Sequence, residues 1–543
     1  MKKMLFTSVC LLGLLGLSAC GSSNETAGAS GKSLPDLGER YKLDEKTPAW
    51  KLDTKDETTK ITWYLNADWW VNLDNYGKNM ITKQFQEDLN IDVEFITGDD
   101  TKLNTMFASG DMPDIITLDN MTTKTAKTAN TWAYALDDLA KKYDPFFFEA
   151  AFKDTLDWYQ LEDGKSYGYS NYSNTKEDYD NGYVSPTTAF IIRKDVYEEL
   201  GKPSMKTPEE FLDVMAQIKE KFPDLYGMGF NSVIASSSAI GNALQDYLGV
   251  PVTDEEGNFY NRNLDEDYLA WVKTLQQAHS QGAISDDTFA DDTTGFDEKV
   301  KTGKYATILM DGTPSQAGNL QAFKDANPGN EYIAIDGPAS TVGNKPQLKN
   351  SGLSGWMSSY ITNKAKDPAK CIQMFTYLLS DEGQLLMNYG IEGETFEYDA
   401  DGKIVMAPEV KALQESGSKD FDKQYGLGQF FIFGNDRYKA WSAEDSTPGA
   451  IKQFVEWGKD KIVPSYEIEN VGPDAGSTES RNSETIQTEW NKDLVSMIRA
   501  KSDKEYDQYL ANYKDALEKN DWAGIQKIAN KKIADNKEKL GLE

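Results

Sequence analysis

The sequence has few cysteines and a single histidine. The cysteines are Cys10, Cys20 and Cys371, and the histidine is His279. Because the first two belong to the N-terminal targeting stretch described below, one thiol remains in the body, which excludes an internal disulfide and a metal site built on cysteine. A single histidine also excludes zinc and haem sites built on histidine. We therefore predict no cofactor and assign no residue as a metal ligand.

The sequence also offers little for nucleophilic catalysis. Ser-His-Asp and Cys-His arrangements would both have to use His279, which lies in the polar stretch Gln-Gln-Ala-His-Ser-Gln-Gly at the end of an expected helix. We interpret His279 as a surface or capping residue. Cys371 stands between Lys370 and Ile372 in an amphipathic pattern, and we interpret it as a buried packing thiol.

Basic residues are scarce relative to acidic ones. The chain has 57 Lys and Arg against 88 Asp and Glu, which gives a formal net charge of -31. A surface of this sign repels nucleic acid and anionic lipid, so we expect no nucleic-acid partner. Repeats and low-complexity stalks are also absent from the sequence, which argues against a surface adhesin or scaffold.

Long apolar runs are missing as well. After the N-terminus, no segment approaches the roughly 20 apolar residues that a membrane-spanning helix needs. The first 20 residues have Lys2 and Lys3, an apolar stretch at 5–17 and small residues before Cys20, which indicates a secretion signal that is removed. The ending Leu-Ser-Ala-Cys resembles the lipobox of bacterial lipoproteins, in which the cysteine is diacylated. An ordinary signal peptide that contains a cysteine is the alternative.

The composition after Cys20 predicts a tether. Residues 21–32 are rich in Gly, Ser, Ala and Asn, as flexible linkers are, and we place the tether at 21–57. With Cys20 as the lipid anchor, we expect the body to lie on the extracytoplasmic face of the cell membrane. It would touch that membrane only through the anchor.

Aromatic residues, in contrast, are abundant. The chain has 12 Trp, 28 Tyr and 23 Phe, or 12% of its residues. Most of these rings must fill the core of a large protein. Trp and Tyr also stack on the apolar faces of sugar rings, while carboxylates and amides bind the hydroxyl groups. The body of about 510 residues exceeds a single typical core, so we expect two lobes.

Apolar periodicity predicts a β-α-β start of the body. Residues 60–65 alternate as a strand, a helical pattern follows at 80–89, and 91–95 alternate again. A helix near 102–109 then leads to a third strand at 114–118. We predict an α/β lobe with a parallel sheet, in which the loops at the carboxyl ends of the strands are placed to meet a ligand.

Local signals place further elements. A strand is expected at 189–193, and Thr207-Pro208-Glu209-Glu210 has an N-cap, a proline at the first helical position and a capping-box glutamate. Turns are expected at 254–258 and 399–402. We interpret the second as a solvated turn, because it lacks the twelve-residue ligand spacing of a calcium loop. The tail from about Asp503 is expected to be helical.

Seven segments then stand in a characteristic order along the chain: ITWYL at 61–65, ASGDMPDI at 108–115, IRKDV at 192–196 with LG at 200–201, DEEGNFY at 254–260, TGKYA at 302–306, PAK at 368–370 leading to SDEGQ at 380–384, and NYGIEG at 388–393. The segments lie between residues 61 and 393, and the likeness extends over about residues 58–520. In this order, behind a lipoprotein signal, they resemble family 1 of the extracellular solute-binding proteins of carbohydrate importers, especially its longer lipoprotein members.

The resemblance implies a two-lobed, periplasmic-binding-protein-like fold of the class II type. Its α/β lobes are each assembled from discontinuous segments and are joined by a hinge that closes on ligand. We place the crossings between lobes near 183–189, 347–355 and 433–440. The first lobe would then comprise 58–187 and about 352–436, and the second 188–351 and about 437–543.

The resemblance also implies where the ligand is contacted: in the loops after the first strands, at the hinge, and after the strand that follows Gly-Lys-Tyr-Ala. Carried over to this sequence, the stacking platforms are Trp69, Trp70, Trp356 and Trp441. The carboxylates that select hydroxyl groups are Asp68, Asp119 and Asp311. Further expected contacts are Asn66, Asn120, Asn231, Met310, Ser354 and Glu392.

We therefore predict a monomeric substrate-binding lipoprotein of an ABC importer, and not an enzyme. It would capture an oligosaccharide by hinge closure and deliver it to the permease in the membrane. A secreted glycoside hydrolase that works with two carboxylates is one alternative, although no barrel repetition is evident. A receptor for a non-sugar solute is the other alternative. The sequence does not decide whether the protein binds a structural calcium ion.

Overall fold

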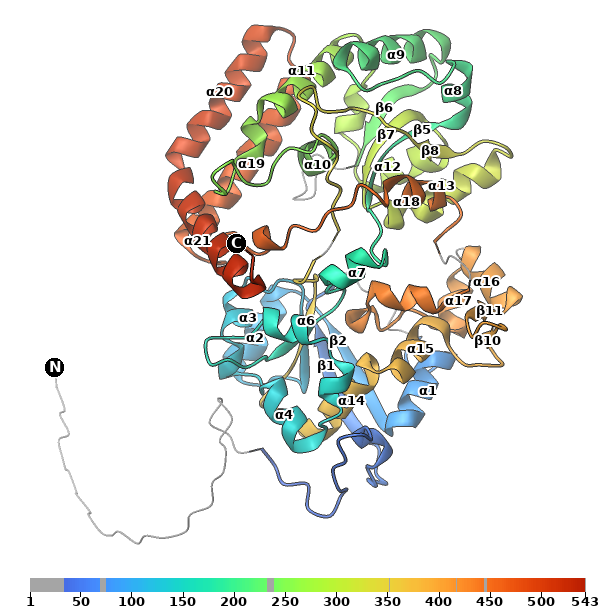
Figure 1. The fold of residues 1–543 in the computed structure, drawn as a ribbon, viewed down its shortest axis with the longest axis vertical. Coiled ribbons are helices and arrows are strands. Elements are labelled where there is room, and N and C mark those ends of the chain that lie inside the picture. Colours follow the sequence, from blue (N-terminus) through green and yellow to red (C-terminus); the bar gives the residue numbers. More distant parts are fainter. Residues whose placement is uncertain are drawn as a thin grey trace, which may run out of the picture.

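Two α/β lobes lie one above the other in the computed structural model (Figure 1). The structure describes residues 34–68, 75–231, 239–350, 352–416, 418–443 and 447–542. Within these ranges, no helix has the length and apolarity to cross a membrane.

A five-stranded sheet forms the centre of the first lobe, in the order β2-β1-β3-β9-β4. Its strands are β1 (Thr59–Leu65), β2 (Ile91–Thr97), β3 (Ile115–Leu118), β4 (Gly168–Ser170) and β9 (Ser358–Ile361). β1 runs parallel to β2 and β3, as the β-α-β pattern predicted. β9 is antiparallel to β3, so the expectation of a purely parallel sheet is wrong. The reason is that the chain returns from the second lobe and enters this sheet at the edge where β3 ends.

The second lobe contains a four-stranded sheet in the order β6-β7-β5-β8. Its strands are β5 (Thr188–Arg193), β6 (Tyr226–Phe230), β7 (Tyr305–Asp311) and β8 (Tyr332–Ala334). β5 is the strand expected at 189–193. It lies antiparallel to both of its neighbours, whereas β6 and β7 are parallel.

Helices cover both faces of the first sheet. α1, α4 and α14 pack over Trp63 and Ile115 on one face, and α2 and α3 pack over Tyr64 and Ile116 on the other. Cys371 of α14 is a free and fully buried thiol, which confirms that it is a packing residue. The helices of this lobe, with a hairpin, are α1 (Met80–Leu89), α2 (Asp100–Ser109), α3 (Lys124–Lys127), α4 (Leu136–Tyr143), α5 (Phe147–Ala150), α6 (Lys153–Trp158), α7 (Lys176–Asp180), α14 (Pro368–Leu379), α15 (Asp381–Tyr389), β10 (Phe396–Tyr398), β11 (Ile404–Met406), α16 (Pro408–Glu415) and α17 (Lys419–Gln424).

The second sheet is also packed between helices. α9 and α11 cover Leu309 on one face, and α12, α13 and α18 cover Ile308 on the other. α9 begins as predicted, with Thr207 as the N-cap, Pro208 as the first helical residue and Glu210 completing the capping box. The helices of this part are α8 (Lys194–Glu199), α9 (Pro208–Lys221), α10 (Leu244–Tyr247), α11 (Glu266–Ser280), α12 (Thr293–Lys301), α13 (Thr313–Ala326), α18 (Lys452–Gly458), α19 (Thr478–Ile498), α20 (Asp503–Lys519) and α21 (Trp522–Leu540).

The chain changes lobes between β4 and β5, between β8 and β9, and again after the β10-β11 hairpin. At this third crossing, Ser442 still bridges to Ile404 of the first lobe, whereas Ala450 and Phe454 are buried in the second. The chain therefore crosses further along than the expected 433–440.

The C-terminal helix α21 lies against both lobes, at the left of Figure 1. Its Asn530 donates to Asn258 Oδ1 of the second lobe at 3.1 Å. Near its end, Lys539 Nζ donates to the carbonyl oxygen of Trp158 in the first lobe at 2.5 Å. We expected all of the chain from about 437 onward to belong to the second lobe, but α21 bridges the two.

The residues before β1 are docked on the end of the first lobe that faces away from the second (dark blue in Figure 1). Trp50 is 7% exposed, and its ring meets that of Tyr377 edge-on with centroids 5.3 Å apart. Leu34 and Leu37 pack against the same apolar cluster. The flexible tether expected at 21–57 therefore does not extend over residues 34–57, because their apolar side chains cover a hydrophobic surface of the lobe.

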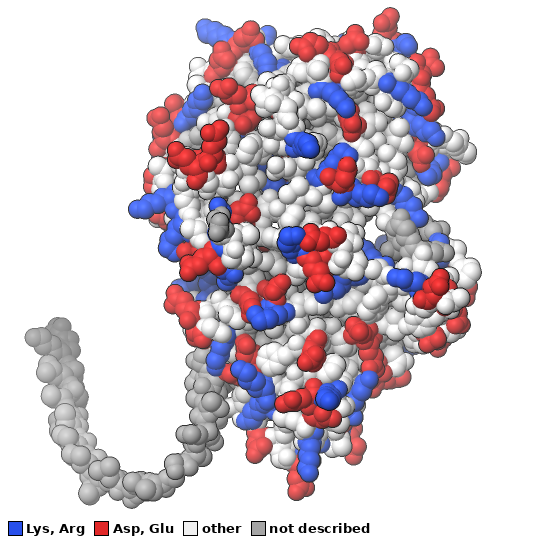
Figure 2. All heavy atoms as spheres, viewed as in Figure 1, with Lys and Arg blue, Asp and Glu red and all other residues white. Residues whose placement is uncertain are grey.

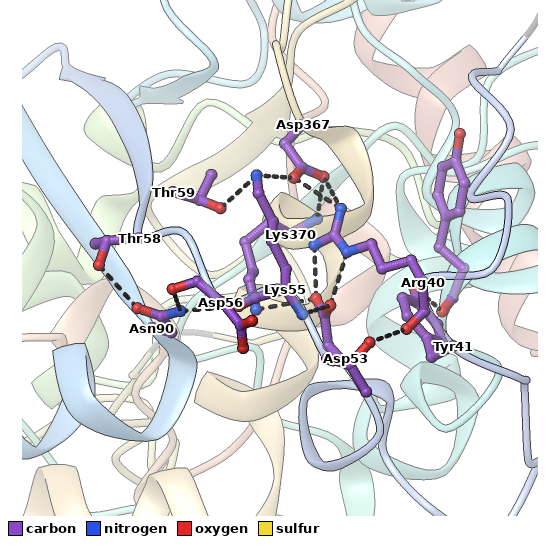
Figure 3. A network of polar contacts seen from close by, with 12 residues as sticks. Arg40, Tyr41, Asp53, Lys55, Asp56, Thr58, Thr59, Asn90, Asp367 and Lys370 are labelled. Carbon is purple, nitrogen blue, oxygen red and sulfur yellow. Dashed lines mark hydrogen bonds and ion pairs between the residues drawn. The ribbon is translucent and has the colours of Figure 1, made fainter.

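A polar network holds this segment in place (Figure 3). Arg40 donates to both oxygens of Asp53, at 2.5 and 2.7 Å, and to both oxygens of Asp367, at 2.8 and 3.0 Å. Lys370 pairs with Asp53 at 3.0 Å and Lys55 with Asp367 at 2.9 Å. Burial by itself would raise the pKa of Asp53. Arg40 and Lys370 lower this pKa by more than burial raises it, so it lies well below its ordinary range. The buried carboxylate stays charged.

We expect Arg40→Met to lower the free energy of unfolding by about 3 kcal/mol, because it removes the main partner of a buried carboxylate. Urea-induced unfolding measures the loss. Lys153→Met is a matched control, since Lys153 pairs with Asp157 at a largely exposed site and should contribute less than about 0.5 kcal/mol. Equal losses in the two variants would contradict the role assigned to the network.

The docked segment also covers a carboxyl group. Asp144 is fully buried, and its Oδ1 accepts a hydrogen bond from the Ala49 N–H at 3.0 Å. Burial raises the pKa of Asp144 to about 6. Between about pH 4 and 6 the folded protein therefore binds a proton that the unfolded chain has released, so the contribution of this group to stability falls as the pH rises through that window.

We expect Asp144→Asn to remove this pH dependence. The variant should be more stable than the wild type at about pH 7, where the wild type buries a charge, and should lose that advantage at about pH 4. Urea midpoints of both proteins at the two pH values measure the difference. If the difference is the same at both pH values, the assignment of the raised pKa to Asp144 is wrong.

Candidate functional site

The carboxyl ends of strands in both sheets face the junction between the lobes. In the first sheet, β9 begins where β3 ends, because Leu118 pairs with Ser358, and β4 ends at the same edge. In the second sheet, Asp311 at the end of β7 pairs with Thr188, the first residue after the crossing from the first lobe. The loops at these two edges therefore border the space between the lobes.

Surface charge does not single out this junction. Figure 2 shows acidic and basic side chains interspersed over the visible face of both lobes. On that face, the acidic side chains are not gathered at one place. The candidate site has to be found from the geometry of particular side chains.

A polar cavity of about 190 Å³ lies at the edge of the first sheet. Asn66 holds its wall together, since its Nδ2 donates to Asp100 Oδ1 at 2.9 Å and to Asp119 Oδ1 at 3.1 Å, and its Oδ1 accepts from the Tyr64 hydroxyl at 3.3 Å. Burial and the neighbouring carboxylates raise the pKa of Tyr64 to about 12. The lining residues are Asn66, Ala67, Asp68, Gly98, Asp99, Asp100 and Asp119.

This lining is rich in hydrogen-bond acceptors. Ionised carboxylates accept hydrogen bonds and donate none, so the cavity suits a ligand with several hydroxyl or amino donors. In the part of the chain that the structure describes, no group of three or more His, Cys, Asp or Glu side chains is arranged to hold a metal ion.

Two stacked aromatic rings lie beside the start of β9. The rings of Trp356 and Phe431 are 5.4 Å apart and within 8° of parallel, and Trp356 is 39% exposed. Tyr172 follows β4 at the same edge, and its φ of 42° is a left-handed conformation that is costly for a residue other than glycine. Its N–H donates to the carbonyl oxygen of Gly434 at 2.8 Å. This edge thus presents a flat apolar face near the acidic cavity.

Across the junction, Asp311 is the last residue of β7, and Asn231 directly follows β6. Asn231 Nδ2 donates to the carbonyl oxygen of Asp311 at 2.7 Å, and the Asp311 N–H donates to Asn231 Oδ1 at 2.9 Å. The amide of Asn231 is therefore engaged in joining the two strands. The carboxylate of Asp311 accepts from Thr188 at 3.2 Å, and burial raises its pKa. Met310 is fully buried in the core of the lobe and presents no surface at this edge.

Asn120 and Ser354 have structural partners at the edge of the first sheet. Asn120 is exposed, and its Oδ1 accepts from the Thr122 N–H at 2.9 Å in the turn after β3. Ser354 stands two residues before Trp356, and its N–H donates to Glu469 at 2.7 Å.

Glu392 and Trp441 lie apart from the acidic cavity. Glu392 is exposed in the turn before β10. Trp441 packs against Tyr438 and lines a different cavity, of about 430 Å³, together with Arg437 and Lys403. Trp69, Trp70 and the anchor residue Cys20 lie outside the described residues.

Sequence reasoning missed several residues at this edge. Asp99 and Asp100 follow β2 as Asp119 follows β3, so the rule about strand ends would have found them. Tyr172 comes after a strand of only three residues, which is too short to recognise by alternation. Phe431 is distant in sequence, and only the fold places it on Trp356.

Comparisons with known proteins agree with this architecture. The family model described as bacterial extracellular solute-binding protein matches residues 70–385. The lipoprotein LipO of Bacillus subtilis (strain 168) is 24% identical over 350 residues, which are 61% of this chain and 64% of that protein. The match thus spans less than two thirds of the length of that relative.

Two solved structures have similar folds. The alginate-binding protein AlgQ2, without calcium ion, has a TM-score of 0.63 and 18% identity, covering 90% of this chain and 100% of that one. The Streptococcus pneumoniae ABC-transporter substrate-binding protein FusA, in complex with kestose, has a TM-score of 0.63 and 16% identity, covering 88% and 99%. The expected two-lobed, periplasmic-binding-protein-like fold is confirmed, and the chain belongs to the family of bacterial extracellular solute-binding proteins.

Proposed function

We propose that this protein is the substrate-binding lipoprotein of a bacterial ABC importer and that it captures an oligosaccharide between its lobes. Family membership supports the binding role. The sugar assignment is supported by the exposed Trp356 stacked on Phe431 at the start of β9 and by the acidic cavity with Asp68 and Asp119 at the same edge of the first sheet. A sugar ring needs both a flat apolar face and hydrogen-bond acceptors for its hydroxyl groups. AlgQ2 is alginate-binding and FusA holds kestose, which adds support.

The proposed contacts come from both lobes. A ligand that touches both edges stabilises the closed state, whereas a ligand that touches one edge has no differential affinity for it. The closed protein would then dock on the permease. The direct contacts that we propose are Asn66, Asp68, Trp69, Trp70, Asp119 and Trp356 on the first lobe and Asp311 on the second. Asn120, Asn231 and Ser354 would border the site, and Met310 would lie beneath it. Glu392 and Trp441 would lie outside the acidic cavity.

A thermal-shift screen of the mature protein tests this function. Kestose and alginate oligosaccharides are the first ligands, with monosaccharides and peptides as controls. A sugar at 100 times its Kd should raise the free energy of unfolding by about 2.7 kcal/mol, since it binds only the folded state. A rise with one glycan class and no glycan turnover would support the proposal. If no sugar raises the melting temperature, the carbohydrate assignment is wrong.

Trp356→Ala should weaken binding of the sugar found in that screen by about tenfold, because it removes the stacking face. Isothermal titration calorimetry measures the change. Phe148→Ala is a matched control, since Phe148 is 42% exposed in α5 and lies outside the candidate site. Similar affinities of the wild type and the Trp356 variant for the sugar would show that Trp356 does not stack on it.

The lipid anchor is tested separately. Metabolic labelling with a clickable palmitate analogue should mark the protein in the membrane fraction, and Cys20→Ser should abolish the label and release the protein. Cys371→Ser is a suitable control, because Cys371 is buried and should not be acylated. Label that persists in the Cys20 variant would contradict the anchor.

A further inference from the structure

The loop 352–357 leads into β9 and carries Trp356, and side chains and backbone of the first lobe hold it on one side. The Asn174 N–H donates to the Gly352 carbonyl oxygen at 2.8 Å, and Ser173 Oγ donates to that of Leu353 at 2.7 Å. The Tyr159 hydroxyl donates to the carbonyl oxygen of Ser354 at 2.8 Å. These contacts use carbonyl groups of the loop. Asn171 Oδ1 of the first lobe also accepts from the N–H groups of Trp356 and Met357, at 3.4 and 2.9 Å, so the N–H groups of Leu353 and Ser354 are left to other partners.

One side chain from the C-terminal part of the chain binds two of those N–H groups. Glu469 accepts from the Leu353 N–H at 3.2 Å through Oε1 and from the Ser354 N–H at 2.7 Å through Oε2. Gly352 makes room for this carboxylate, since a Cβ at that position would lie 1.8 Å from Glu469 Oε1. The fit of a carboxylate over two successive N–H groups therefore depends on a glycine beside it.

Glu469 is itself held by α21. The side chain of Asn536 on that helix donates to the carbonyl oxygens of Glu467 and Glu469 at 3.0 and 2.9 Å. The ring of Tyr466, three residues earlier, packs in a cluster with Trp158 and Leu353. The carboxylate therefore reaches the loop from a segment fixed to the C-terminal helix that bridges the lobes.

We propose that Glu469 is a positioning residue that keeps Trp356 in the orientation required for ligand stacking and links this orientation to α21. The ligand role of Trp356 rests on the function proposed above, whereas the holding of the loop does not. Two charge-assisted hydrogen bonds to adjacent N–H groups restrict the backbone directly before Trp356. A change in the placement of α21 would move the carboxylate and, with it, the stacking face.

The test uses the full mature chain without any sugar. Glu469→Gln replaces one acceptor oxygen by a donor that opposes an N–H group, and Gly352→Ala displaces the same carboxylate without altering its charge. Hydrogen exchange should be about tenfold faster at Leu353 and Ser354 in both variants. Glu467→Gln, which removes the same charge two residues away, is the control and should leave exchange unchanged.

Fluorine NMR of 5-fluorotryptophan reports on Trp356 itself, with its resonance assigned through Trp356→Phe. We expect the resonance to shift or broaden in the Glu469 and Gly352 variants but not in the Glu467 variant. Unchanged exchange and an unchanged resonance in Glu469→Gln would overturn the proposal, and so would equal effects of Glu467→Gln. Both measurements are made without sugar. A failed sugar screen would therefore overturn the proposed function but would not affect the test of Glu469.

Discussion

Hydrogen bonds to backbone carbonyl groups join the segments that cross between the lobes, and the rest of the junction is arranged around them. Leu348 donates to the carbonyl oxygen of Lys461 at 2.9 Å, and Val463 donates to that of Leu348 at 2.9 Å. Asn350 Nδ2 donates to the carbonyl oxygen of Ser185 at 2.6 Å, which ties the second crossing to the first. These contacts set which edges of the two sheets face each other.

The crossings also explain how distant residues meet. The chain enters the first sheet at the edge where β3 ends, so β9 must run antiparallel and Trp356 comes to lie near Asp119. Phe431, from the later part of the same first-lobe segment, packs on Trp356, and Glu469, which follows the third crossing, binds the loop before it. The stacking face and its support thus come from three separate parts of the sequence.

Local sequence rules worked where the determining interactions are local. Alternation of apolar residues located β1, β2 and β3, and the capping box located the start of α9, because each of these signals acts within a few residues. The rules failed where the conformation of a segment depends on a surface formed by residues far away in the sequence. Residues 34–57 look like a linker by position, but Trp50 and Arg40 find partners more than 300 residues away. The side-chain amide of Asn231 likewise binds the backbone of Asp311, which is distant in sequence, and local rules could not predict this contact.

By itself, the sequence determined the α/β class, the scarcity of cysteine and histidine, and the strand ends at which Asn66 and Asp119 stand, and its resemblance to a known family implied the two-lobed fold and the placement of Asp311. These follow from composition, periodicity and motif order, which do not require knowledge of the packing. The tertiary structure alone decided the direction of β9, the burial of Met310, the docking of the N-terminal segment and the contact of Glu469 with the Trp356 loop. Each of these is a contact between residues far apart in the chain, and such contacts leave no periodic trace in sequence.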